Sequence, residues 1–356
     1  MRSVKERHMD QLADYVRGLY REPRLRHLFL ELTLQCNERC FHCGSSCTPM
    51  RAEDQLSLAE YRAILEQVKE DFDLTKLQLC ITGGEPLLRP DFFEILGYAH
   101  ELGYRWGMTS NAILITPEVA RRLAETGMET ISVSIDGLRE THDLLRGTPG
   151  GYDLAMRGIR NLLELGRFHA VQVTTVVNHE NIGELDELFE IMDGLDIDSW
   201  RVVNLEPIGR ALQWPSRMLT REDYLRLFSF IREKRQAGYP VEYGCSHYLG
   251  PAWERELRDW YWVCNAGIYT ASIMANGDIG ACLDIERRPE TVQGNIRQSR
   301  FRDVWEKRFE LFRRDLSAGS AFCEGCPHAD HCRGDAHHSW NYDKNEPMLC
   351  FRDLLF

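Results

Sequence analysis

The chain lacks the features of several large protein classes. It has no apolar run of roughly 18 residues or more, so no segment predicts a membrane span. Its formal net charge of −12 leaves no excess of positive charge, which argues against general binding to nucleic-acid phosphates. Its first residues form a charged helical pattern without an apolar signal core, and no repeat or low-complexity stretch is evident. We therefore expect a cytoplasmic globular protein that binds neither membrane nor nucleic acid.

Cysteine, in contrast, is plentiful. The 356 residues include 12 cysteines, and in a reducing compartment such a number indicates metal or redox chemistry more often than disulfides. Three of them share one short segment near the start of the chain, and seven lie between Cys245 and Cys350. The sequence thus has two candidate metal-binding regions.

The first region is a C-x3-C-x2-C triplet that directly follows the apolar segment at residues 28–34. Three thiolates on one tight loop can hold three irons of a [4Fe–4S] cluster and leave the fourth iron open for chemistry. From the residues alone, a zinc-binding loop is the alternative. The expected ligands are Cys36, Cys40 and Cys43, and the aromatic His42 precedes the last of them.

Small or polar residues also lie at the ends of three later apolar segments, at 77–81, 104–108 and 131–135. In parallel α/β sheets, ligands collect at the carboxyl ends of the strands. A capping or turn role is the alternative for each such residue. The candidates are Gly83, Gly84, Glu85, Asn111, Ser134 and Asp136, with Arg146 a little further along the chain.

In type and order, these motifs resemble those of the radical S-adenosylmethionine (SAM) enzymes. In that family the methionine part of SAM chelates the open iron, and electron transfer cleaves SAM to a 5′-deoxyadenosyl radical that abstracts a substrate hydrogen. The resemblance implies a SAM site with Gly83, Gly84 and Glu85 at the amino group, Asn111, Ser134 and Asp136 at the ribose and carboxylate, Arg146 as a carboxylate partner, and His42 beside the cluster.

The second cysteine region has the spacing C-x12-G-x4-C followed by C-x2-C-x5-C. A structural zinc ribbon is the alternative, because C-x2-C also suits tetrahedral zinc. The spacing resembles that of the SPASM domain, which holds auxiliary iron–sulfur clusters in peptide-modifying radical SAM enzymes. The resemblance assigns one complete auxiliary cluster to Cys323, Cys326, Cys332 and Cys350.

The other auxiliary site departs from the SPASM pattern, because Ala336 stands where a further cysteine is usual. We expect a three-cysteine cluster with an open iron at this site, and the alternative is that no second auxiliary cluster forms. Carboxylate and imidazole groups also serve as iron ligands. The candidate ligands are Cys264 and Cys282, then Cys245 as a third thiolate, and Asp335 or His337 as a non-thiolate ligand.

Between residues 23 and 209 the pattern alternates apolar strands with amphipathic helices, which favours a parallel α/β sheet. The resemblance implies a partial (βα)6 TIM-like barrel followed by a small cysteine-rich SPASM-type domain. We expect a helical extension at 1–24, the barrel at 25–240 and the auxiliary domain at 241–356. Helices are predicted at residues 58–68, 91–102, 117–126, 151–165 and 182–192.

The resemblance implies a maturase that cleaves SAM reductively and abstracts hydrogen from a residue of a ribosomally made peptide, to give a crosslinked, epimerised or oxidised residue. It also implies a precursor peptide and a reductant such as flavodoxin or ferredoxin as partners. A separate peptide-recognition protein is a further candidate partner, because the helical extension is too short to be one. Cys245 is a candidate hydrogen donor for an epimerase. The alternatives are oxidation of a small molecule such as a sugar or porphyrin, maturation of a sulfatase, and a non-enzymatic iron–sulfur carrier or scaffold.

Overall fold

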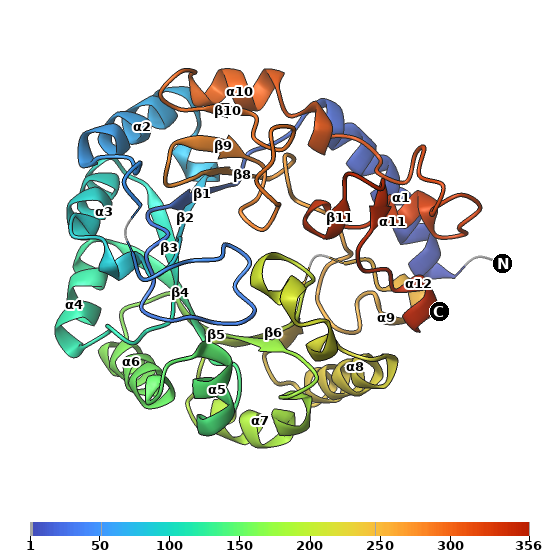
Figure 1. Ribbon diagram of the computed structural model, residues 1–356, viewed down its shortest axis with the longest axis horizontal. Helices are drawn as coiled ribbons and strands as arrows, with labels where there is room; N and C mark the ends of the chain where they lie inside the picture. Colours follow the sequence, from blue (N-terminus) through green and yellow to red (C-terminus); the bar gives the residue numbers. More distant parts are fainter. Residues whose placement is uncertain (1–2, 51, 246, 356) are drawn as a thin grey trace.

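A curved sheet forms the centre of the computed structural model, which describes residues 3–50, 52–245 and 247–355 (Figure 1). The strand order is β10-β9-β8-β1-β2-β3-β4-β5-β6-β7. Strands from β8 through β7 are parallel to their neighbours, whereas β9 and β10 are antiparallel additions at one edge. The strands are β1 (His27–Glu31), β2 (Gln78–Thr82), β3 (Arg105–Ser110), β4 (Met128–Ser134), β5 (Ala170–Val177), β6 (Ser199–Asn204), β7 (Val241–Tyr243), β8 (Thr270–Ile273), β9 (Asp278–Gly280) and β10 (Gly294–Asn295).

Helices lie along the outer side of this sheet, and the long loop that follows β1 crosses its inner side (Figure 1). Amphipathic sequence explains the arrangement: α2 buries Tyr61, Ile64, Leu65 and Val68, which share one helical face. The longer helices are α1 (Val4–Arg21), α2 (Leu58–Asp71), α3 (Phe92–Glu101), α4 (Pro117–Glu125), α5 (Arg139–Arg146), α6 (Gly151–Leu165), α7 (Leu185–Asp193), α8 (Arg221–Gln236) and α10 (Phe301–Lys307). The shorter elements are α9 (Gly250–Trp253), α11 (Ala329–Cys332), α12 (Arg352–Leu355), β11 (Trp340–Asn341) and β12 (Glu346–Pro347).

The predicted α/β class and barrel-type parallel sheet are confirmed. Four of the five predicted helices match α2, α3, α4 and α6 to within three residues at each end, and the fifth becomes a short 3-10 helix at Ile182–Glu184 followed by α7. Ser57 caps α2 by accepting a hydrogen bond from the Glu60 amide, while the Glu60 carboxylate accepts from the Ser57 amide. No helix was predicted for α5, which the structure places directly after the end of β4.

The C-terminal part of the chain joins the same sheet. Strand β8 pairs with β1 in parallel register, with Leu28 opposite Ala271 and Leu30 opposite Ile273. The expected division at residue 240 falls between α8 and β7, so the sheet continues on both sides of it. The first strand of the barrel is therefore an inner strand, because β2 covers one of its edges and β8 the other.

Helix α1 packs against the C-terminal region, and the two lie side by side in Figure 1. His331 Nε2 lies 2.8 Å from an Asp10 carboxylate oxygen, and Arg333 donates a hydrogen bond to the Ala13 carbonyl oxygen. The apolar face of the helix also meets Tyr248 and Trp262 through Met9. The N-terminal helix thus packs against the cysteine-rich region and stabilises it. None of the described helices is both long and apolar enough to cross a membrane.

Glu31, at the end of β1, should tie the N-terminal strand to the C-terminal region. Its carboxylate is fully buried, accepts a 3.0 Å hydrogen bond from the Ala275 amide and pairs with Arg287. Because Glu31→Ala leaves that amide and guanidinium without their acceptor, we expect a loss of about 2–4 kcal/mol in the free energy of unfolding. Urea unfolding under anaerobic conditions measures this loss.

Glu286→Ala is the matched control, because the Glu286 side chain is exposed and, among the described residues, forms an ion pair only with the neighbouring Arg288, at 3.5 Å. We expect it to change the free energy of unfolding by less than about 0.5 kcal/mol. Equal unfolding curves for the Glu31 and Glu286 variants would contradict the role of Glu31.

Candidate active site

The cysteine triplet lies on the loop that follows β1, at the carboxyl ends of the parallel strands. The Glu38 amide donates to Cys36 Sγ and the Cys47 amide donates to Cys43 Sγ, each at 3.5 Å. Such N–H···S contacts suit thiolates that bind a cluster. Burial raises the pKa of Cys36 to about 11, whereas a hydrogen bond from the Cys47 thiol lowers that of Cys43 to about 5.

This loop fits the cluster that the sequence predicts. The Cys43 thiol lies close enough to Cys36 and Cys40 to raise the pKa of both electrostatically. Two buried polar atoms nearby, Glu38 Oε1 and His42 Nδ1, have no hydrogen-bond partner among the described residues. Since buried polar atoms are normally satisfied, they mark a place for a bound group.

The glycine pair after β2 packs against the start of the cysteine loop. Gly83 has a φ of +148°, and a Cβ atom there would lie 2.3 Å from the Thr33 carbonyl oxygen. At Gly84 a Cβ atom would lie 2.1 Å from the Gln35 carbonyl oxygen. The amides of Gly84 and Glu85 donate to these same two carbonyls, at 2.7 and 2.9 Å. Glycine is thus required for the close approach of two backbone segments, and contact of these residues with SAM stays a prediction.

Glu85 links the ends of β2 and β3. Its fully buried carboxylate accepts hydrogen bonds from the Ser110 hydroxyl at 3.0 Å and from the Asn111 amide at 2.9 Å. The Asn111 side chain in turn donates to Asn37, inside the cysteine loop, at 2.7 Å. Burial raises the pKa of Glu85 to about 7. These bonds connect two strand ends to the loop.

Arg146 joins the end of β4 to the cysteine loop. Its buried guanidinium pairs with Asp136 at 2.8 Å and with Glu38 at 2.6 Å. His42 Nε2 also lies 3.1 Å from the Asp136 carboxylate. The structure therefore brings together Asp136, His42 and Arg146, three of the residues that the sequence analysis named. Ser134, another of them, lies half-buried at the end of β4. The guanidinium donates to the protein's own carboxylates, and contact with SAM is again a prediction.

The four cysteines assigned to a complete auxiliary cluster, Cys323, Cys326, Cys332 and Cys350, line one cavity. Cys332 ends α11, and Cys323 and Cys326 lie in the turns before it, where the Cys326 amide donates to the Cys323 carbonyl at 3.1 Å. The fourth follows β12, so the chain returns to the same place after residue 347. This convergence fits a four-thiolate site.

Cys264 and Cys282 also come together, because the Thr270 hydroxyl donates to the carbonyls of Asn265 and Ala281, the residues beside them. The His337 amide donates to the Cys264 sulfur, so the buried Ala336 lies next to this pair. The side chain of His337 instead faces Tyr342, with Nδ1 2.9 Å from its hydroxyl oxygen. Asp335 is held by His247 and the Tyr248 amide.

Cys245 lies beyond β7 and lines a cavity of about 250 Å³ together with Cys282. His42 from the cysteine loop lines the same cavity, so this space joins the barrel to the C-terminal region. The Cys245 thiol is 3.9 Å from the Asn204 carbonyl oxygen, and burial raises its pKa well above the usual value. The structure thus brings Cys245 near one member of its expected cluster, and its role as a ligand or hydrogen donor stays a prediction.

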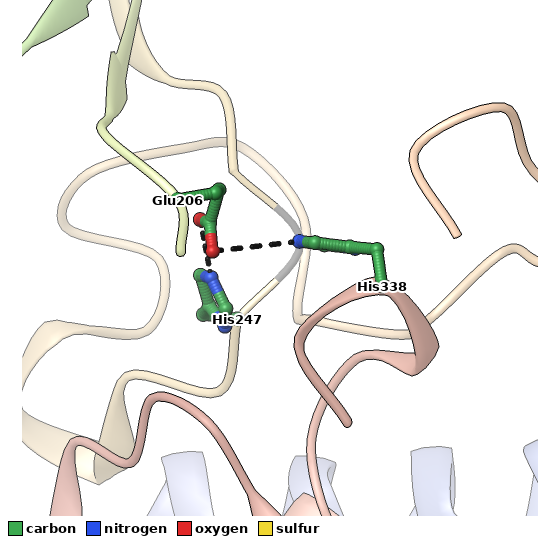
Figure 2. Close-up of side chains that lie close together, drawn as sticks. All are labelled: Glu206, His247 and His338. Carbon is green, nitrogen blue, oxygen red and sulfur yellow. Dashed lines mark hydrogen bonds and ion pairs between the residues drawn. The ribbon is translucent and has the colours of Figure 1, made fainter. Parts of the chain in front are cut away.

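Three residues that the sequence analysis did not assign gather beside Cys245: Glu206, His247 and His338 (Figure 2). They come from the loops after β6 and β7 and from the 3-10 helix His337–Ser339. Glu206 and His247 are 41 residues apart, and His338 is more distant still. No local spacing could have indicated the group, because only the tertiary fold brings these residues together.

A parallel barrel with a cysteine triplet at its rim and a second cysteine-rich module defines a SAM-cleaving iron–sulfur enzyme. Residues 30–192 match the model of the radical SAM superfamily, and residues 264–327 match that of the SPASM iron–sulfur cluster-binding domain. The chain belongs to the radical SAM superfamily and carries a C-terminal SPASM domain. Its cofactors are accordingly SAM and iron–sulfur clusters.

Similar proteins include the mycofactocin maturase MftC of Mycobacterium tuberculosis, which is 32% identical over 85% of this chain and 76% of that protein. The AdoMet-dependent heme synthase of Methanosarcina barkeri is 29% identical over 93% of this chain and 97% of that protein. Among solved structures, Streptococcus suis SuiB bound to S-adenosylmethionine has a TM-score of 0.70 at 21% identity, covering 88% of this chain and 73% of SuiB. The predicted family is therefore confirmed, together with its fold.

His142 should make this site sensitive to acid. The side chain is buried, and Nδ1 accepts a 3.1 Å hydrogen bond from the Asp136 amide, which requires a neutral imidazole. Burial, followed by the charge of Arg146, lowers the pKa of His142 to about 4. Because the unfolded pKa is about 6.5, the unfolded chain takes up a proton first as pH falls, and stability is lost between pH 6.5 and 4.

At pH 5 this loss should be about 2 kcal/mol relative to pH 7.5. His142→Gln keeps an acceptor for the Asp136 amide but cannot take up the proton. We therefore expect the variant to lose about 2 kcal/mol less than the wild type over this pH interval, as measured by urea unfolding. An equal loss in both proteins would contradict the assignment.

Proposed function

We propose that this enzyme modifies a residue of a ribosomally made peptide by radical chemistry. The supporting observation is a cavity of about 510 Å³ whose lining combines the barrel rim with the SPASM region. The cysteine loop contributes Gly44, Ser45 and Ser46, and the C-terminal region contributes residues around Asp284 and Trp340. The exposed apolar side chains of Leu212 and Met348 also line it, as suits a peptide side chain entering from solvent.

At the barrel rim, Cys36, Cys40 and Cys43 would hold the catalytic cluster. When SAM is bound there, reductive cleavage supplies the 5′-deoxyadenosyl radical that abstracts hydrogen. The protein holds the cysteine loop in place, because Arg146 pairs with Glu38 in the loop and with Asp136 after β4. Buried ion pairs of this kind hold one arrangement of the site.

Cys323, Cys326, Cys332 and Cys350 form a closed set of four thiolates that would hold an auxiliary cluster. That cluster would supply an acceptor for the electron that a substrate radical must lose to form a crosslink or a double bond. The cavity between His42 and Cys282 gives a path from the barrel toward the SPASM region. A reductant such as flavodoxin or ferredoxin would return electrons to the catalytic cluster.

MftC supports the peptide assignment, because it is named a mycofactocin maturase and is similar over most of both chains. SuiB is described in a complex with its precursor peptide SuiA, and its fold matches that of this chain. A second candidate is modification of an iron porphyrin, which the similarity to AdoMet-dependent heme synthases supports. Arg287 and Arg288 line the larger cavity but already pair with Glu31 and Asp343, which disfavours the binding of porphyrin carboxylates.

Recognition of the SAM amino group by Glu85 can be tested with a variant that keeps the size and shape of the side chain. Glu85→Gln removes the negative charge that would meet the ammonium group, a charge-assisted bond of roughly 1.5–3 kcal/mol. At pH 8, above the pKa of about 7, we expect SAM binding to weaken about ten- to a hundredfold in equilibrium dialysis. The iron content and cluster spectrum are the controls for an intact site, and unchanged affinity would limit Glu85 to its role in linking β2 and β3.

The substrate assignment is tested by co-expressing the enzyme with any short peptide encoded beside its gene. Mass spectrometry should detect a loss of hydrogen for a crosslink or oxidation, or an unchanged mass with altered retention for epimerisation. The matched control changes Cys36, Cys40 and Cys43 together to alanine, which should remove about four irons and abolish 5′-deoxyadenosine formation. An unmodified peptide, together with turnover of iron coproporphyrin III by the purified enzyme, would favour the porphyrin candidate instead.

A further inference from the structure

Glu206, His247 and His338 direct their polar atoms toward one another at the edge of the cavity that holds Cys245 (Figure 2). Glu206 Oε1 lies 2.6 Å from His247 Nε2, and Glu206 Oε2 lies 3.7 Å from His338 Nε2. The potential ligand atoms of the three residues all lie within 4.8 Å of one another. Two imidazoles and one carboxylate at this spacing need only small shifts to bind a common ion at about 2.0–2.2 Å.

The second nitrogen of His247 is already engaged. Asp335 pairs with His247 Nδ1, and its other carboxylate oxygen accepts a 2.8 Å hydrogen bond from the Tyr248 amide. A histidine that binds a metal commonly has its other ring nitrogen bonded to a carboxylate, which orients the ring and raises its basicity. His247 therefore has the surroundings of a metal ligand on its far side, with Nε2 directed toward Glu206.

A proton on His247, held between Asp335 and Glu206, accounts for only part of this arrangement. Glu206 Oε1 already accepts from the Asn204 side chain at 3.0 Å as well as facing His247. Glu206 Oε2 is buried without a hydrogen-bond partner among the described residues, and His338 approaches it no closer than 3.7 Å. An unsatisfied carboxylate oxygen is costly to bury. A proton on His247 does not satisfy Glu206 Oε2, whereas a cation between Glu206 and His338 would.

We propose that Glu206, His247 and His338 bind a single divalent transition-metal ion, separate from the iron–sulfur clusters. Two imidazoles and a carboxylate are ligands that suit Zn²⁺ and Fe²⁺ and leave coordination positions open. Glu206 and His338 line the cavity that His42 and Cys282 also line, so the open positions would face this cavity. There, and only if the proposed function holds, an oxygen or nitrogen atom of the substrate would complete the coordination.

Zn²⁺ alone is the probe, and the test needs no substrate, so its outcome is independent of the proposed function. The reconstituted enzyme is dialysed anaerobically against micromolar Zn²⁺, and bound zinc and iron are counted by mass spectrometry. We expect one zinc per chain in the wild type. His338→Ala and Glu206→Gln should weaken Zn²⁺ binding at least tenfold, and Asp335→Asn should weaken it about ten- to a hundredfold.

The matched control is His179→Ala, which breaks another histidine–carboxylate pair, with Asp223 at 2.7 Å, on the exposed surface. It should keep the full zinc content. His338→Ala changes a side chain that makes no close hydrogen bond to any of the described residues, so it guards against a variant that fails to fold. Far-ultraviolet circular dichroism checks the fold of each variant.

Three results would overturn the site. The first is no bound zinc in the wild type beyond a background common to all variants. The second is zinc binding by His338→Ala and Glu206→Gln equal to that of the wild type. The third is the loss of about four irons in either variant, because these residues would then belong to an iron–sulfur cluster and not to a mononuclear ion.

Discussion

Arg146 is the group on which the arrangement of the active site depends. Its guanidinium lies between Asp136, just after the end of β4, and Glu38, inside the cysteine loop. Burying two carboxylates without a cation would be strongly unfavourable, so the loop can take this position only with the arginine in place. Arg146 holds Glu38, and the Glu38 amide donates a hydrogen bond to the sulfur of Cys36, so Arg146 also influences where Cys36 lies. The strand that ends at Ser134 thus helps to determine where the predicted cluster ligands lie.

Much of the barrel could be predicted because its signals are local. The helical periodicity around Tyr61 and the capping residue Ser57 both lie within one element, and the Gly83-Gly84-Glu85 segment follows its strand directly. The partners of these residues could not be predicted in the same way. The sequence predicted that Gly83 and Gly84 let the backbone approach a ligand closely. The structure shows that they also let it approach the backbone of the cysteine loop closely.

The residues missed by the sequence analysis share one physical property: their meaning depends on distant segments. Glu206 follows β6, His247 follows β7 and His338 lies in the C-terminal region, and each alone resembles an ordinary loop residue. The pairing of β8 with β1 is equally non-local, since apolar patterning identifies a strand but not its neighbour. The sequence showed that Ala336 stands where a cysteine is usual. It did not show that Glu206, His247 and His338 gather beside Cys245.

The position of β8 beside β1 has a consequence for synthesis of the chain on the ribosome. Strand β1 and the cysteine loop emerge early, whereas the strand that covers the second edge of β1 emerges only after most of the chain has been made. Until then β1 has an open edge, and Glu31 lacks both Ala275 and Arg287. Contacts between such distant segments fold slowly, because a long loop must close first. The cysteine triplet therefore stays outside a finished barrel until the segment that contains β8 has been made.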